Sequence, residues 1–391
     1  MTRRHGIGAL GLAIVILFCG AAYGQDKPTI DLKWYGYVKL DAAEDQNLSS
    51  HGNYILWVER KTNAADDGQF NMTADQTRLG LKAAVKGIKP LVNAQLELDL
   101  YGGVTGASVP ENKPIFQMRH AFFTVQSGQF KLLAGQTWDL AAPLNPSTLN
   151  YAVLWGCGNI GFRRPQVSFF YAVPAGDSAA VTLAAGLFRV IGGDLTPTGD
   201  STVADGFDDG ADAGLPSVQG RLEFEDQSTS GISTRAGVSG LWGKLRAEDK
   251  LAAISTEYDS WGLAGHLTAS STSGCGVAVE AFIGSNLSAY YGGILDKDRF
   301  NGLKTKGGWG SIWMKPAATV VTTVGMGMDD PDNAGVADAG RTFNRCYFGN
   351  VVVTPWPQVS MGLEISHWDT YYRGRGKSDD LRGQTSLMVT F

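Results

Sequence analysis

The sequence lacks the features that define several common protein classes. It has only four cysteines in 391 residues and no CxxC pair, which excludes a scaffold held together by many disulfides. Beyond the amino terminus, no window offers the roughly 18 consecutive apolar residues that a membrane-spanning helix needs. No proline- or serine-rich linker divides the chain, and its formal net charge of −5 makes it a poor partner for nucleic acid.

The amino terminus instead has the pattern of an export signal, with two arginines, an apolar stretch and small residues before Gln25. This pattern predicts a signal peptide over residues 1–24 and a mature chain over 25–391, whose formal charge is −7 once the two arginines are removed. Cys19 leaves a lipoprotein signal open, although the bulky Phe18 stands where such signals resemble one another in having a small side chain. Three cysteines remain, so at most one disulfide can form.

What the sequence has in excess is glycine, at 51 residues, together with 10% aromatic residues and almost neutral mean hydropathy. Polar and apolar residues alternate over many segments, which is typical of strands with one polar and one apolar face. Between residues 92 and 100, for example, Asn93, Gln95, Glu97 and Asp99 are polar and the residues between them are apolar. In a soluble sandwich the apolar face would cover a core, whereas in a membrane barrel it would face lipid.

The spacing of the alternating segments favours the barrel. Strands are predicted at 32–41, 76–85, 90–102, 115–126, 129–138, 162–173, 178–191, 217–226, 231–244, 254–270, 275–285, 305–315, 318–329, 338–354, 357–372 and 381–391. Most reach the roughly 9 to 11 residues that a tilted strand needs to cross the hydrocarbon. Long connections alternate with short ones, as an extracellular and a periplasmic rim require. The sequence therefore predicts an all-β fold, a 16-stranded antiparallel transmembrane β-barrel.

Two further features agree with this fold. The chain ends in an alternating strand whose last residue is Phe391, which resembles the terminal signature by which the barrel assembly machinery recognises outer-membrane proteins. Aromatic residues near predicted strand ends suggest interfacial girdles, with ordinary strand aromatics as the alternative. These residues are Trp34, Phe116, Tyr171, Trp261, Trp313 and Trp368.

Residues 34–170 resemble the DcaP-like trimeric porins of Gram-negative bacteria. The resemblance is carried by five short motifs, which are YGYVKLD at 35–41, TRLG at 77–80, RHAFF at 119–123, GQTW at 135–138 and GNIGFRRPQ at 158–166. Beyond this region the strand count and Phe391 agree with the family, but individual motifs are weaker.

The resemblance implies a homotrimer in the outer membrane and a channel for small anionic solutes, often dicarboxylates, selected by arginines. It also implies a constriction loop that folds into the lumen, here from Asp139 to Gly161. Some family members carry a long polar coiled segment at the amino terminus. No counterpart is expected here, because the first predicted strand begins soon after Gln25, so a role of that segment in trimer assembly is not carried over.

Seven residues are expected to line the pore and set its selectivity. They are Arg78, Lys82, Arg119, Lys131, Asp139, Arg163 and Arg164. Arginine suits an anion constriction because it stays charged and its donors match carboxylate geometry, and fixed cations in a narrow pore favour anions. Arg163 and Arg164 are adjacent, so only one can point straight inward from a strand. The alternative is that the arginines pair with acids such as Glu97, Asp99 or Asp139 and stabilise the fold without touching solute.

The remaining motifs are interpreted as structural. Residues 156–161 match GxGxxG, but the following Arg-Arg-Pro blocks the helix that a dinucleotide site needs, so these glycines are expected to form a tight loop. The acidic stretches 205–212 and 329–333 could hold calcium but lack EF-hand spacing, and solvated surface loops are the better interpretation. The histidines have no metal-binding spacing. No cofactor and no metal site is predicted.

The sequence therefore predicts a passive diffusion channel for small hydrophilic solutes, with a preference for anions, and not an enzyme. Two alternatives stay open, which are an outer-membrane barrel enzyme of the phospholipase or protease type and a closed structural or adhesive barrel. The expected partners are the solutes, outer-membrane lipid, the assembly machinery and further copies of the same chain.

Overall fold

The computed structural model describes residues 28–61, 67–102, 114–197, 206–227, 231–249, 251 and 253–391. The predicted signal peptide lies outside the described residues. The strands are β1 (Thr29–Asp45), β2 (Gln69–Thr73), β3 (Arg78–Lys86), β4 (Leu91–Asp99), β5 (Gln117–Ser127), β6 (Phe130–Trp138), β7 (Arg163–Pro174), β8 (Ala179–Phe188), β9 (Ser217–Asp226), β10 (Ile232–Asp249), β11 (Ile254–Ser271), β12 (Gly276–Ser285), β13 (Lys304–Ala317), β14 (Val320–Pro331), β15 (Arg341–Trp356), β16 (Val359–Tyr372) and β17 (Gly376–Thr390). Short helical turns, α2 (Asp209–Asp212), η2 (Ser288–Tyr290) and η3 (Gly293–Leu295), lie in the connections.

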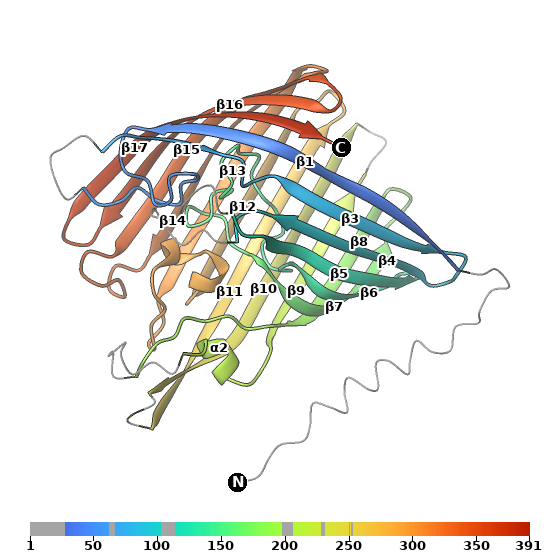
Figure 1. The fold of residues 1–391 in the computed structure, drawn as a ribbon. Helices are drawn as coiled ribbons and strands as arrows, with labels where there is room; N and C mark the ends of the chain where they lie inside the picture. Colours follow the sequence, from blue (N-terminus) through green and yellow to red (C-terminus); the bar gives the residue numbers. More distant parts are fainter. Residues whose placement is uncertain are drawn as a thin grey trace, which may run out of the picture.

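The strands form one closed antiparallel sheet (Figure 1). The sheet closes between its first and last strands, where β1 pairs with β17 from Tyr37↔Thr390 to Asp45↔Arg382. On its other edge β1 pairs with β2 at one end and with β3 at the other, so these two strands share one position in the wall. The predicted 16-stranded antiparallel barrel is therefore confirmed, with its second strand interrupted at residues 74–77.

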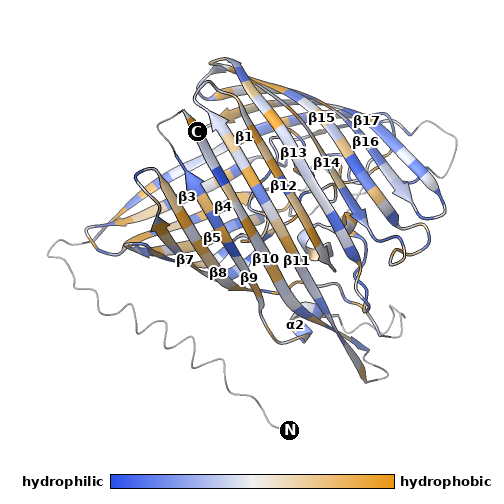
Figure 2. Cartoon of the chain, turned by 180° about the vertical axis from the view of Figure 1, so that it is seen from behind, coloured by the Kyte–Doolittle hydropathy of each residue, from blue (hydrophilic) through white to orange (hydrophobic). Residues whose placement is uncertain are grey.

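The two faces of the wall differ in polarity, as the alternation predicts. Large apolar side chains on the outer face are exposed, for example Leu96, Phe123, Leu222, Leu263 and Val324, and Figure 2 shows hydrophobic residues spread along the strands of the wall. The residues between them face inward and are mostly polar or small. A continuous apolar surface of this extent is typical of a protein that contacts lipid. None of the described helices is long and apolar enough to cross a membrane.

The connections separate two rims. On one rim they are short, at 87–90, 128–129, 175–178, 227–231, 272–275, 318–319 and 357–358. On the other rim they include 46–68, 100–116, 139–162, 189–216 and 286–303. The predicted alternation fails at 250–253 and 373–375, which are also short. There β10 continues to Asp249 and β17 begins at Gly376. Residues 245–249 and 376–380, which were predicted as loop, therefore lengthen these strands at the long rim.

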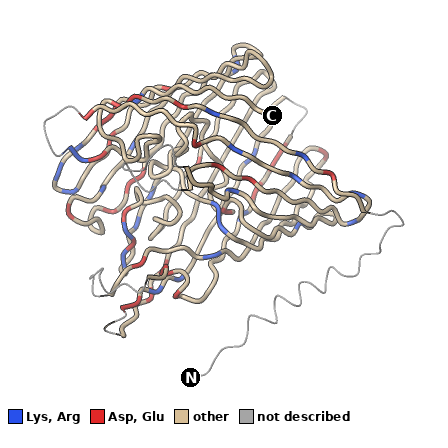
Figure 3. The backbone as a smooth tube through the Cα atoms, viewed as in Figure 1, with Lys and Arg blue, Asp and Glu red and all other residues tan. Residues whose placement is uncertain are grey.

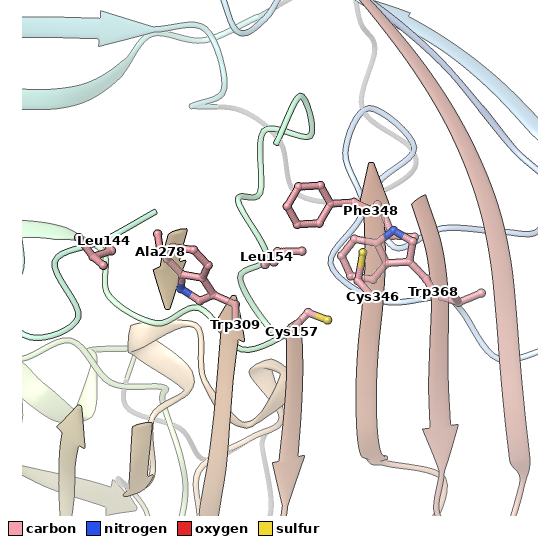
Figure 4. Packing of buried hydrophobic residues seen from close by; sticks show 10 residues of the cluster. Leu144, Leu154, Cys157, Ala278, Trp309, Cys346, Phe348 and Trp368 are labelled. Atoms are coloured by element: carbon pink, nitrogen blue, oxygen red, sulfur yellow. The ribbon is translucent and has the colours of Figure 1, made fainter. Parts of the chain in front are cut away.

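Segments 46–61 and 139–161 of the long rim pack against the inner face of β12–β17. Figure 4 shows part of the resulting apolar cluster, in which Leu144, Leu154 and Cys157 meet wall residues such as Trp309 and Trp368. Other members of this cluster are Ile55, Val58, Ala278, Cys346 and Phe348.

The predicted aromatic girdle is only partly correct. Trp368 is 1% exposed and belongs to the cluster inside the barrel, and Trp313 packs against that cluster. Both occupy inward positions of their strands, so they cannot reach a membrane interface. Trp34 and Phe116 are 70% and 63% exposed, as the girdle requires.

Candidate channel lining

Segment 139–161 follows the inner face of the barrel over many strands, held by inward side chains that bind its backbone. Gln219 on β9 accepts from the Leu140 amide at 2.9 Å, and Glu280 on β12 accepts from the Leu144 amide at 3.2 Å. Glu364 on β16 accepts from the Leu149 amide at 2.7 Å. These inward acceptors come from β9, β12 and β16, which are far apart around the wall, so the segment runs across the inside of the barrel.

Two close approaches need glycine. A Cβ built at Gly327 on β14 would collide with the carbonyl oxygen of Cys157, and one built at Gly158 would collide with the carbonyl oxygen of Gly308 on β13. Gly158 also has a φ of 103°, which disfavours other residues. The glycines of the GxGxxG match therefore serve close packing of a turning loop, as the sequence predicted.

We call the inner face of β12–β17, with its apolar cluster, the packed wall, and the inner face of β3–β9 the charged wall. Figure 3 shows basic and acidic residues together on the strands of the charged wall. All of the cationic site residues predicted from the sequence lie on strands of this wall, and Asp139 directly follows its strand β6.

Arg119 is the centre of a buried ion-pair network. Its Nε donates to Glu97 at 2.7 Å and its Nη1 to Asp99 at 2.7 Å, while the hydroxyl of Tyr151, on segment 139–161, lies 3.4 Å from the same Nη1. Arg78 lies 3.8 Å from Glu97 and is 24% exposed at its side chain. This is the pairing that the sequence left as an alternative, and it neutralises much of the charge of Arg119.

A β-bulge explains why Arg119 and His120 are both buried. The register passes from Glu97↔His120 directly to Leu98↔Met118, so Arg119 is an extra residue on β5. A bulge shifts the alternation of the strand, and neighbouring side chains then share a face. The His120 ring lies 2.9 Å from the hydroxyl of Thr137 and braces β5 against β6.

Lys82 and Lys131 have a different environment from Arg119. The Nζ of Lys82 lies 4.9 Å from the centre of the Tyr35 ring, and the Nζ of Lys131 lies 4.1 Å from that of Phe170. Neither makes an ion pair with any carboxylate in the part of the chain that the structure describes. Their positive charges are therefore not cancelled by a directly bound acid.

Arg163 and Arg164 are both buried, but they have different partners. Arg164 is fully buried, and its Nε lies 2.7 Å from Asp139, which also accepts from the Phe162 amide at 2.9 Å. Burial raises the pKa of the Asp139 carboxyl, and the Arg164 guanidinium opposes this shift. Arg163, 2% exposed, lies over the rings of Trp138 and Phe162. Both arginines thus stabilise the start and end of segment 139–161.

A second basic group, Arg221 with Arg235 and His266, was missed from the sequence. Arg235 on β10 lies 2.8 Å from Glu223 on β9, Arg221 lies 3.4 Å from the same carboxylate, and the His266 ring lies 3.1 Å from it. Two arginines thus share one acid on the charged wall. The alternation of β9, with Val218, Leu222 and other outward apolar residues, was sufficient to place Arg221 inside.

No group of three His, Cys, Asp or Glu side chains among the described residues is arranged to hold a metal ion. Of the acidic stretch 205–212, Asp205 lies outside the described residues. The sequence predicted that Asp209 would be a solvated loop residue, and this prediction is wrong. Asp209 is 1% exposed and accepts a hydrogen bond from Tyr258. Burial raises the pKa of Asp209 to about 6.

No protein-family model matches this sequence, and no curated protein matches it. Solved structures with the same fold do exist. The outer membrane channel DcaP of Acinetobacter baumannii superposes with a TM-score of 0.71 at 18% identity, covering 93% of this chain and 97% of that one. The anion-selective porin from Comamonas acidovorans gives 0.57 at 11% identity, covering 93% and 100%. The trimer form of in-vitro folded OmpT, an outer membrane protein of Vibrio cholerae, gives 0.54 at 11% identity, covering 94% and 100%.

The architecture is therefore that of the outer-membrane porins, a closed 16-stranded antiparallel barrel. At these identities the likeness concerns the fold, and the function has to be argued from the site.

Proposed function

We propose that this chain is an outer-membrane porin that passes small hydrophilic solutes by passive diffusion and favours anions such as dicarboxylates. The observation that carries the proposal is the pair Lys82 and Lys131, two cations on the charged wall that bind no carboxylate among the described residues. A fixed charge in a narrow channel raises the local concentration of counter-ions and lowers their barrier to passage.

Segment 139–161 supports this function as the constriction loop. The segment binds the packed wall through Glu280 and Glu364 and reaches the charged wall through Tyr151, so it narrows the lumen from within. We place the passage beside Lys82 and Lys131. Arg78, Arg221 and Arg235 then act with the two lysines along the passage. Arg119, Arg163, Arg164 and Asp139 hold the loop and the wall in place, and contribute to selectivity through the residual field of their network.

The similar structures support the assembly and the location. One is an anion-selective porin and another is the trimer form of an outer membrane protein. We extend these properties to this chain as an outer-membrane homotrimer, whose exposed apolar band contacts lipid. Phe391, whose backbone pairs with Gly36 on β1, completes the barrel and is the signal for assembly.

The test is the reversal potential of the purified protein in a planar bilayer under a salt gradient. The wild-type channel is expected to favour anions, and Lys82→Gln with Lys131→Gln is expected to reduce that preference. Lys306→Gln is the matched control, because Lys306 is 70% exposed at its side chain and lies on the outer face of β13. Folded protein without conductance would refute the channel, and equal shifts in the double variant and the control would refute the role of the lysines.

A further inference from the structure

The two buried cysteines of the described chain come from distant parts of the sequence and meet inside the barrel. Cys157 lies on segment 139–161 and is 0% exposed, and Cys346 lies on β15 of the packed wall and is 1% exposed. Both belong to the same apolar cluster, where Figure 4 shows them near Leu154 and Trp368. In the structure both are free thiols.

Gly327 lies next to both cysteines. It is the cross-strand partner of Cys346, and residues opposed in this way have Cα atoms about 4.5 to 5.5 Å apart. Because Gly327 has no side chain, the carbonyl group of Cys157 occupies the space where its Cβ would project, and the Cys157 thiol lies 3.4 Å from the Gly327 carbonyl oxygen. Cys157 thus lies over the neighbour of Cys346, on the same face of the wall and in the same apolar cluster.

We propose that Cys157 and Cys346 form a disulfide in the exported protein, which ties segment 139–161 covalently to β15. A disulfide joins residues whose Cα atoms are about 4.4 to 6.8 Å apart, and Cys157 contacts Gly327, the residue opposite Cys346 in the sheet. Cys275, exposed in the turn 272–275, is left as the free thiol. The inference rests on the fold and on export, and not on the solute that passes the channel.

The chemistry is a thiol–disulfide exchange with a protein oxidant that carries a reactive disulfide, of the class found in oxidising compartments. Each thiol loses a proton, one S–S bond forms in this chain, and the oxidant's disulfide takes up the two electrons and two protons to become a dithiol. Burial raises the pKa of the Cys157 thiol well above its usual range, so the reactive thiolate is scarce once the loop is packed. The exchange therefore takes place before the barrel closes around the segment.

The experiment is peptide mapping of the mature protein, exported, folded and purified, after denaturation in iodoacetamide without reductant. The expected result is alkylation of Cys275 alone and a linked peptide pair that contains Cys157 and Cys346. Reduction before alkylation should release this pair. Alkylation of all three cysteines without reductant, or a linkage that includes Cys275, would overturn the proposal.

Two variants sharpen the assignment. Cys275→Ser, away from the apolar cluster, should leave the linked pair unchanged and remove the remaining alkylation. Cys157→Ser should expose Cys346 to alkylation under the same denaturing conditions. If Cys157→Ser does not fold, the wild-type map and Cys275→Ser still decide between a disulfide and two free thiols.

Discussion

The packed wall and the charged wall are made by the same alternation of polar and apolar residues, yet their inner faces differ in use. The packed wall places Trp309, Phe348 and Trp368 inward, and polar groups such as Glu364 bind the backbone of the segment that covers them. The charged wall places cations inward, and some of them, such as Arg78 and Lys82, stay partly exposed inside the barrel. Contact with lipid requires apolar residues on the outer face of every strand. The inner face has no such common requirement, so its residue types differ from one part of the barrel to another.

Because the backbone of segment 139–161 touches the packed wall, a larger side chain on this wall should lower the stability of the barrel more than one on the charged wall. Gly327→Val is expected to cost about 3 kcal/mol, because the new side chain meets the backbone of Cys157, which cannot move without displacing segment 139–161. The measurement is the temperature at which the folded, fast-migrating form disappears on a denaturing gel. Gly383→Val is the control, since a Cβ there meets no atom within 4 Å. Equal melting of the two variants would show that the segment does not pack as described.

The acids of the packed wall should act through hydrogen bonds to the loop. Glu364→Ala removes the acceptor of the Leu149 and Asn150 amides and of the Asn350 side chain. Leaving buried donors unpaired is expected to cost about 2 kcal/mol and to increase conductance noise as the segment loosens. Glu257→Ala, which removes an exposed ion pair with Lys244, should change neither stability nor noise. A quiet, stable Glu364→Ala channel would contradict the role of this carboxylate.

The fold was predictable because its rules are local. Alternation with a period of two, and turns between the alternating segments, fix the strands and their number without knowledge of distant contacts. The two failures on the long rim, at 250–253 and 373–375, arise where strands extend beyond the membrane and no apolar face marks their ends. The inward position of Trp368 was predictable, because Trp368 lies four residues after the polar Glu364 on the same strand and therefore shares its face.

The site was predictable only in part. Alternation placed Arg78 and Lys82 on an inward face, but the bulge at Arg119 could not be foreseen, because it depends on the register between β4 and β5. Pairing of Arg164 with Asp139 was one of two open alternatives, and only the folded chain brings the two together at 2.7 Å. The close contact of Gly327 with Cys157 could not be predicted from the sequence either, because the two residues are 170 positions apart.

The long connection 286–303 provides a pH-dependent test of packing in the lumen. Asp298 is 5% exposed, and burial raises its pKa from 3.8 to about 6. The folded form therefore holds the proton more tightly than the unfolded form does, so the stabilisation is complete below about pH 4 and is lost as the pH rises through 6. Stability should be greater at pH 5 than at pH 7.5, by on the order of 1 kcal/mol from this group.

Asp298→Asn isolates this contribution from the other acids. It should raise the melting temperature at pH 7.5 and reduce the difference between the two pH values, because the amide carries no charge to bury. Asp338→Asn, at a carboxylate 75% exposed, should leave the pH dependence unchanged. An unaltered pH dependence in Asp298→Asn would mean that this carboxyl does not titrate in the folded protein.

The smallest expected effect is a change of selectivity on the charged wall without loss of structure. Glu97→Gln removes one negative charge beside Arg78 and Arg119. Its amide oxygen still accepts from Arg119, and its NH2 group replaces the oxygen that accepts from Tyr35 and donates to the Tyr35 hydroxyl instead. The two guanidinium groups then contribute more positive field, and the reversal potential should move further toward that of a purely anion-selective channel. The opposite substitution, Lys131→Glu, should move it the other way. An unchanged reversal potential in Glu97→Gln would show that the network faces away from the conducting path, and that the two lysines select the ion without it.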